Sequence, residues 1–154
     1  MQAGFIGLGT MGASMAANLQ KGLKARGDTL VVHDIRREAA ARHVKDGAVW
    51  VDSPQAVAEQ SEVIFTSLPG PPEFEAVAAG LLAGIKKGTA YFDLTTNSPT
   101  VVRKAHDTFA AKGAYPPAYE AFQRRAIDPN GAEQPMLRLV DGQGTEVEVG
   151  RSIV

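Results

Sequence analysis

Short apolar runs recur through the first three quarters of the chain, and stretches with apolar residues at helical spacing separate them. Continuous apolar runs of this length suit parallel strands that are covered on both faces. The runs are 3–6, 29–33, 48–51, 63–68 and 89–94. The helical stretches are 11–23, 38–45, 54–60, 74–79 and 100–112. In the first of them, the expected inward face consists of Met11, Met15, Ala16, Leu19 and Leu23. This alternation predicts an α/β fold, a doubly wound and mainly parallel sheet with helices on both faces.

The pattern changes after the last of these helices. Residues 116–154 are rich in Gly, Pro and charged residues. Apolar spacing over 119–127 predicts one further helix. The arms 136–140 and 145–149 flank Asp-Gly-Gln-Gly, a strong turn signal, and predict a β-hairpin. We therefore expect 116–154 to be a divergent tail, separate from a domain over 1–115.

A glycine-rich loop joins the first predicted strand to the first predicted helix. Its residues are Gly7, Leu8, Gly9, Thr10, Met11 and Gly12. A strand, a G-x-G-x-x-G loop and a helix in this order predict a Rossmann-type dinucleotide-binding domain. Gly7 would allow a tight turn, Gly9 a close approach of the pyrophosphate, and Gly12 close packing of helix on strand. The alternative is a tight turn without a ligand.

Asp34 ends the second predicted strand, about 20 residues beyond the loop, where this fold places an acid. A carboxylate there accepts hydrogen bonds from the adenosine ribose and repels a 2′-phosphate, which indicates NAD. Arg36 and Arg37 follow, and arginines at this turn can hold a 2′-phosphate. The arginines also suit a solvated helix start. We favour NAD over NADP because the acid stands at the strand end itself.

Two further strand ends carry candidate chemistry. Leu68 and Pro69 end the fourth run, and ligands bind at this edge of such sheets, beside the loop. Thr95, Thr96 and Asn97 follow the fifth run. Their hydroxyls and amide suit a nicotinamide ribose or a substrate carboxylate. The alternative is an ordinary polar turn that a capping serine closes.

Composition narrows the class of protein. The 154 residues are 44% hydrophobic and 21% charged, with a net charge of -1 and no basic stripe that would indicate nucleic acid. No apolar run approaches the roughly 20 residues that span a bilayer, so we expect a cytoplasmic protein without a membrane partner. The chain lacks cysteine, and His33, His43 and His106 are too widely separated to indicate a metal site. We expect His33 to be buried and the other two to be exposed.

Three segments resemble the β-hydroxyacid dehydrogenase family, which includes 3-hydroxyisobutyrate dehydrogenase and the cofactor domain of 6-phosphogluconate dehydrogenase. They are GFIGLGTMG at 4–12, FTSLPGP at 65–71 and DLTTNSP at 93–99. The resemblance covers residues 3 to about 113. It implies hydride transfer between a nicotinamide cofactor and a small 3-hydroxy acid substrate.

The same resemblance implies roles for single residues. The glycine loop would hold the pyrophosphate and Asp34 the ribose, with Arg36 at the same end of the cofactor. Leu68 and Pro69 would line the nicotinamide. Thr95 or Thr96 would contact the cofactor or the substrate carboxylate. We assign Thr95 to the cofactor, and Thr96 with the neighbouring Asn97 to the substrate.

Beyond residue 113 the sequence departs from the family pattern. Residues 115–122 do not align with the family's substrate-binding Asp-Ala-Pro-Val-Ser-Gly-Gly segment, and its helical domain with the catalytic lysine is absent from these 154 residues. We therefore assign no catalytic residue. The chain is predicted to be the cofactor domain of such an oxidoreductase, or alternatively a truncated dinucleotide-binding module without turnover. Family members are usually dimers or tetramers, so a homo-oligomer is a candidate assembly.

Overall fold

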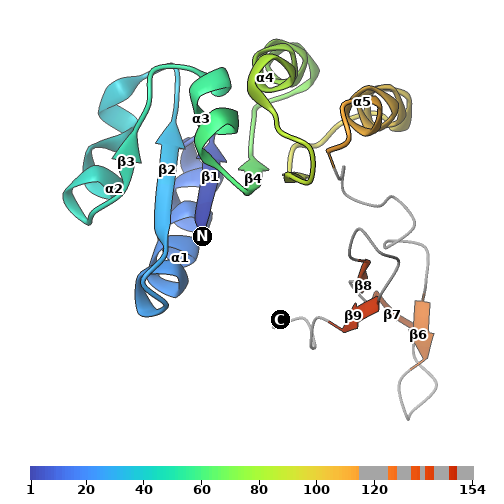
Figure 1. Cartoon of the computed structure of the whole chain (residues 1–154), viewed down its shortest axis with the longest axis horizontal. Coiled ribbons are helices and arrows are strands. Elements are labelled where there is room, and N and C mark those ends of the chain that lie inside the picture. The colour runs from blue at the N-terminus through green and yellow to red at the C-terminus, as the bar shows by residue number, and fades with distance from the viewer. Residues whose placement is uncertain (115–124, 128–132, 136–137, 141–145, 149–154) are drawn as a thin grey trace. The chain divides into compact units, whose positions relative to one another are not determined.

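The computed structural model describes residues 1–114, together with the short strands 125–127, 133–135, 138–140 and 146–148. The chain divides into two compact units, Met1–Pro116 and Pro117–Val154, which are treated separately below (Figure 1).

The first unit alternates strands and helices as the apolar pattern predicts. Its strands are β1 (Gln2–Ile6), β2 (Thr29–His33), β3 (Val49–Trp50), β4 (Val63–Thr66) and β5 (Ala90–Asp93). Its helices are α1 (Thr10–Ala25), the 3-10 helix η1 (Arg37–Ala40), α2 (Ala41–Lys45), α3 (Pro54–Gln60), α4 (Pro71–Gly84) and α5 (Pro99–Ala111). The helix starts at Ser53-Pro54 and Ser98-Pro99 follow capping rules, because serine accepts a backbone N–H and proline needs no partner at the first turn.

The five strands form one parallel sheet in the order β3-β2-β1-β4-β5. The chain works outward from β1 to β3 and then returns to place β4 on the other side of β1. This reversal makes the space above β1 and β4 the switch point of the sheet, where α/β folds bind ligands. The predicted Rossmann-type α/β fold is confirmed.

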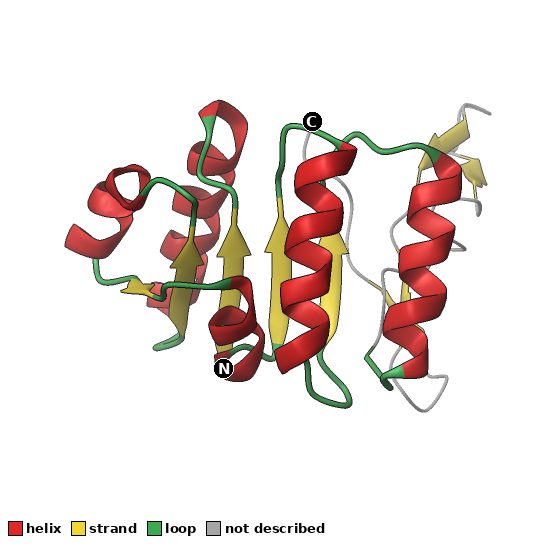
Figure 2. Cartoon of the chain, turned by 90° about the horizontal axis from the view of Figure 1, so that it is seen from above, coloured by secondary structure: helices red, strands yellow, loops and turns green. Residues whose placement is uncertain are grey.

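Two apolar clusters lie on opposite faces of the sheet, because side chains alternate along each strand. Val31 belongs to one cluster, with residues of α3, α4 and α5, while its neighbours Leu30 and Val32 belong to the other, with residues of α1 and η1. Figure 2 shows helices in front of and behind the sheet. Burial on both faces is why the strands appear in the sequence as continuous apolar runs.

The inward face of α1 differs from the expected one. Met11 and Met15 are 66% and 36% exposed, and the buried residues of the helix are Gly12, Ala16, Gln20 and Leu23. The contact of Gly12 with the glycine loop brings the helix start close to β1, so small residues face the sheet and the methionines turn outward.

The expected exposure of His43 is wrong. His43 is 2% exposed, and its Nδ1–H donates to Gln20 Oε1 at 3.3 Å, while Gln20 Nε2 donates to the His43 carbonyl at 2.9 Å. Burial lowers the pKa of His43 from its ordinary value, with Arg42 adding to the effect. The polar pair joins α1 to α2. His33 is buried as expected, and its Nδ1–H donates to the Val51 carbonyl at 2.9 Å.

In the second unit the structure describes two strand pairs. β6 (Arg125–Ile127) pairs antiparallel with β7 (Glu133–Pro135), and β8 (Arg138–Val140) pairs antiparallel with β9 (Glu146–Glu148). The helix expected over 119–127 is wrong at β6, where cross-strand hydrogen bonds take the backbone groups that a helix would use. Residues 119–124 and the turn expected over 141–144 lie outside the described residues.

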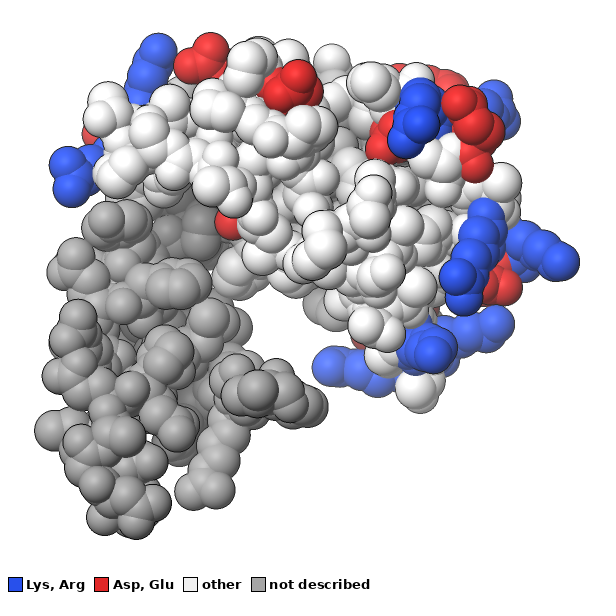
Figure 3. Space-filling view, turned by 180° about the vertical axis from the view of Figure 1, so that it is seen from behind, with Lys and Arg blue, Asp and Glu red and all other residues white. Residues whose placement is uncertain are grey.

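The surface carries charges of both signs. Figure 3 shows Lys and Arg close to Asp and Glu round the margin of one face, with an uncharged area between them. Within the described part of the chain, no helix is long and apolar enough to cross a membrane.

Candidate functional site

The glycine loop between β1 and α1 lies tightly against the neighbouring backbone. Gly7 has a φ of 93°, in the left-handed region that favours glycine. A Cβ at Gly7 would overlap the Ser67 carbonyl oxygen, and a Cβ at Gly12 would overlap the carbonyl oxygen of Gly7. Packing within the chain therefore requires glycine at both positions.

Gly9 is different. Its φ of -69° suits any L-residue, and no described atom lies within 4 Å of where its Cβ would be. Packing among the described residues thus gives no reason for glycine here. A ligand that approaches the backbone from outside does give one, because a Cβ would stand in its way.

The start of α1 points its amides at the same open space. The first four N–H groups of a helix lack intrahelical partners. Ser53 Oγ accepts from Ala56 N at 3.1 Å at the start of α3, and Ser98 Oγ accepts from Val101 N at 3.4 Å at the start of α5. For α1, by contrast, the described residues provide no side-chain cap and no acid in its first turn. Thr10 and Met11, both exposed, are its first two residues.

Asp34 lies at the end of β2, in contact with the glycine loop. Its Oδ2 accepts the Leu8 N–H at 2.7 Å, and its Oδ1 accepts the Arg36 N–H at 2.9 Å. The carboxylate thereby ties the loop to the turn after β2, and each oxygen keeps capacity to accept another hydrogen bond. The Arg36 side chain is exposed beside it.

The ends of β4 and β5 are also joined. The Leu68 N–H donates to Thr95 Oγ1 at 3.1 Å. The position that a Cβ of Gly7 would take lies 3.1 Å from Leu68 Cδ2, so the turn after β4 borders the glycine loop. Pro69 and Thr96 are exposed at this edge. The structure thus brings the loop, Leu68 and Thr95 together in one region.

Asp93, which the sequence analysis did not single out, organises this edge. Its Oδ1 accepts the Thr66 hydroxyl at 2.7 Å and the Thr95 N–H at 3.1 Å, and its Oδ2 accepts Asn97 Nδ2 at 2.8 Å. The Thr66 hydrogen is used, so the Tyr91 hydroxyl must donate to Thr66, at 3.0 Å. An aspartate at a strand end, directly before a polar turn, is the sequence signal of such a turn.

This network leaves one polar atom without a hydrogen-bond partner, and it contains one group whose pKa is strongly raised. Asn97 Oδ1 is buried without a hydrogen-bond partner among the described residues. Burial raises the pKa of the Tyr91 hydroxyl, and the charge of Asp93 raises it further, so Tyr91 stays protonated as a donor.

A cavity of about 460 Å³ is lined by residues of η1, α2 and β3. Its lining residues are Arg37, Glu38, Ala40, Ala41, Val44 and Trp50. The Arg37 guanidinium lies 5.8 Å from the centre of the Trp50 ring, and Trp50 Nε1 donates to Asp52 at 2.8 Å. Its lining includes none of the strand-end groups described above. In the described part of the chain, no cluster of three or more His, Asp or Glu is arranged to hold a metal ion.

The sheet order and the glycine loop at the switch point define a Rossmann-type dinucleotide-binding domain. Residues 2–115 match the family described as the NAD binding domain of 6-phosphogluconate dehydrogenase, and the chain belongs to this family. The expected relation to the β-hydroxyacid dehydrogenases is confirmed.

Two curated relatives illustrate the match. The 2-(hydroxymethyl)glutarate dehydrogenase of Eubacterium barkeri is 38% identical over 116 residues, which are 73% of this chain and 37% of that protein. The mitochondrial 3-hydroxyisobutyrate dehydrogenase of Drosophila melanogaster is 35% identical over 152 residues, 94% of this chain and 42% of that protein. The chain spans about two fifths of the length of these relatives.

A solved structure described as Psf3 in complex with NADP+ and 2-OPP is 33% identical, with a TM-score of 0.63, over 74% of this chain and 40% of that one. Residues 2–115 are therefore an NAD(P)-binding domain of this family, similar to part of the 3-hydroxyisobutyrate dehydrogenases.

Proposed function

We propose that the carboxyl edge of the sheet binds a nicotinamide dinucleotide, with its pyrophosphate over Gly9 and the uncapped start of α1. The observation that carries this proposal is the open space at Gly9, where neither φ nor packing among the described residues requires glycine. The unpaired Asn97 Oδ1 is a second observation that fits a ligand at this edge. The pyrophosphate would accept hydrogen bonds from the amides of Thr10 and Met11.

At the adenosine end, Asp34 would accept the ribose hydroxyls with the capacity that Leu8 and Arg36 leave unused. We infer that NAD is preferred, because the Asp34 charge is held beside the ribose and would repel a 2′-phosphate. The exposed Arg36 and Arg37 side chains oppose this preference, and NADP+ is the cofactor in the Psf3 complex.

At the other end, Leu68 and Pro69 would line the nicotinamide, and Thr95 would contact it. Thr96 and Asn97 would face the substrate. The cofactor, when bound, supplies the hydride chemistry, and the residues of this chain bind and orient it. We propose hydride exchange with a small 3-hydroxy acid as the activity of the complete enzyme, since both curated relatives are named as dehydrogenases.

Location and assembly are finer parts of the proposal. We propose a cytoplasmic enzyme, although the Drosophila relative is named as mitochondrial. Self-association would use the outer edge of β5, which pairs with no described strand, because such an edge offers backbone hydrogen bonds to a second copy.

The test is a calorimetric titration of the 154-residue chain with NADH, NADPH and ADP-ribose, in which the released heat reports binding. Trp50 is the sole tryptophan, so its emission gives a second readout near the adenosine end. We expect all three ligands to bind and NADH to bind more tightly than NADPH. Binding of none would refute the proposal. An assay with 3-hydroxy acids then separates a competent enzyme from a module that binds without turnover.

A further inference from the structure

Asn97 has a polar atom with no assigned use. Its Nδ2 donates to Asp93 Oδ2 at 2.8 Å, while its Oδ1 is buried without a partner in the described part of the chain. A carboxylate only accepts hydrogen bonds, so the nitrogen must face Asp93, and the orientation of the amide is settled by chemistry. The remaining group of Asn97 is therefore an acceptor.

Buried acceptors without a partner are rare in native proteins, and each calls for a physical reason. The segment around Asn97 lies at the carboxyl edge, and its neighbours Leu94, Thr96 and Ser98 are exposed. Because these neighbours are exposed, the segment has room to shift, and contact between Oδ1 and a ligand requires such a shift. The atom is thus a candidate recognition group.

The chemistry of the site restricts which ligand group can pair with this atom. A substrate carboxylate offers only acceptors, and the Asp93 charge beside Asn97 would repel it. Thr95 Oγ1 already accepts the Leu68 N–H, so its own hydrogen is left to donate. One donor and one acceptor, two residues apart, complement a primary carboxamide, which presents one C=O and one NH2 group.

We propose that Asn97 and Thr95 recognise the carboxamide of the nicotinamide ring. Asn97 Oδ1 accepts an N–H of that group, and the Thr95 hydroxyl donates to its carbonyl oxygen. Asp93 is the positioning residue, because its carboxylate holds the Thr95 backbone and the Asn97 side chain together. This inference rests on the proposed function and moves Asn97 from the substrate to the cofactor.

The test compares NAD+, its 3-acetylpyridine analogue and ADP-ribose in calorimetric titrations. The analogue replaces the carboxamide NH2 by a methyl group, and ADP-ribose lacks the ring. For the unaltered chain we expect the analogue to bind about fivefold more weakly than NAD+, the effect of one hydrogen bond. Asn97→Ala should weaken the binding of NAD+ by about fivefold and leave the affinities for the analogue and for ADP-ribose unchanged. Thr100→Ala, at an exposed position of α5, is the control and should change none of the three affinities.

Two results would overturn the inference. One is equal weakening of NAD+ and its analogue by Asn97→Ala, and the other is equal weakening of NAD+ and ADP-ribose. If Asn97→Ala does not fold, the affinities of the unaltered chain still test the inference. Equal affinity of the unaltered chain for NAD+ and the analogue also overturns the inference. If the unaltered chain binds ADP-ribose but binds NAD+ and the 3-acetylpyridine analogue equally, this inference fails while the proposed function still stands. Failure of all three ligands removes both proposals.

Discussion

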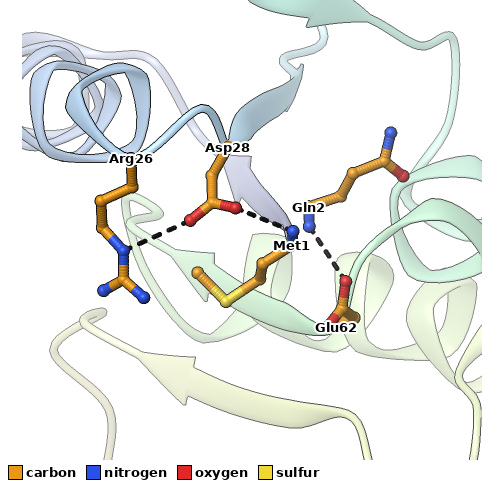
Figure 4. Close-up of polar contacts among 5 residues, drawn as sticks. All are labelled: Met1, Gln2, Arg26, Asp28 and Glu62. Carbon is orange, nitrogen blue, oxygen red and sulfur yellow. Dashed lines mark hydrogen bonds and ion pairs between the residues drawn. The ribbon is translucent and has the colours of Figure 1, made fainter.

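The two ends of the parallel sheet differ in how their polar groups are paired. At the amino ends of the strands, the Met1 ammonium lies 2.8 Å from Asp28 Oδ1, and Arg26 Nε lies 3.5 Å from the other oxygen of Asp28 (Figure 4). Beside them the Gln2 N–H donates to Glu62 Oε1 at 3.1 Å. These groups find their partners within the chain, and Ser61 Oγ, next to Glu62, is the one buried polar atom at this end without a partner among the described residues.

At the carboxyl ends the pairing is incomplete. Among the described residues, nothing fills the space at Gly9, no side chain caps α1, and Asn97 Oδ1 lacks a donor. Exposed ion pairs such as those of Asp28 add little to stability, because water and salt screen them. A buried acceptor without a donor is unfavourable, and the exposed amides at the start of α1 are left to solvent or a ligand. The contrast separates an edge that closes the fold from the edge at which we propose that the cofactor binds.

Gly12→Ala should give the largest loss of stability. A Cβ there would overlap the Gly7 carbonyl oxygen, so α1 must move away from β1. Such overpacking costs about 1–3 kcal/mol or more. Denaturant unfolding measures the change. Gly22→Ala, on the exposed side of the same helix with nothing within 4 Å, is the matched control and should stabilise by about 1 kcal/mol. A Gly12→Ala protein as stable as the control would contradict the close approach.

Asp34→Asn should change cofactor choice. The amide keeps the shape of the side chain but removes the charge that opposes a 2′-phosphate, so the NADP+ to NAD+ affinity ratio should rise by about tenfold. Paired titrations with both nucleotides measure it. Asp46→Asn makes the same charge change at an exposed position after α2 and should leave the ratio unaltered. An unchanged ratio in Asp34→Asn would show that Asp34 does not face the ribose.

His43 should make the first unit sensitive to acid. Its folded pKa lies below the unfolded value near 6.5, so the unfolded chain binds more protons and stability falls as pH drops below about 6.5. One group gives a slope of at most about 1.4 kcal/mol per pH unit. The unfolding free energy from melting curves between pH 5 and 7.5 should fall towards acid with a slope of this size. His43→Gln should make this pH dependence weaker. An equal slope in both proteins would place the titrating group elsewhere.

Asp28→Asn should have the smallest effect. The pKa of Asp28 is lowered because the Met1 ammonium donates to it, so the pair contributes at neutral pH and is lost as pH falls through the carboxyl range. The partners are open to solvent, and the melting temperature should drop only slightly, with the difference vanishing at high salt. A loss of stability as large as that of Gly12→Ala would contradict the weak contribution assigned to the ion pairs at the amino ends of the strands.

Local signals predicted much of the fold. Strands such as Val63–Thr66 were recognisable because burial on both faces leaves a continuous apolar run. The Ser53-Pro54 and Ser98-Pro99 helix starts are confirmed, because capping uses atoms only three residues apart. The exposure of Met11 was not foreseen, since helical spacing alone does not say which side of a helix approaches the sheet.

Contacts between residues far apart in the chain could not be predicted from the sequence. Thr66 and Asp93 are 27 residues apart, and Gln20 and His43 are 23 apart, so neither pair leaves a local pattern. The central role of Asp93 and the burial of His43 both depend on such contacts. The distinction between Gly9 and the other two glycines, by contrast, was predicted from their places in the motif.

Gly9→Ala tests the central claim most directly. Alanine adopts the φ of this position and meets no described atom, so stability should change by no more than about 1 kcal/mol. The added Cβ blocks the pyrophosphate, and the affinity for NADH should fall at least tenfold, about the loss of one charged hydrogen bond. Gly22→Ala should keep the original affinity. Calorimetric titration of both variants gives the answer, and unchanged NADH binding by a folded Gly9→Ala protein would contradict the account.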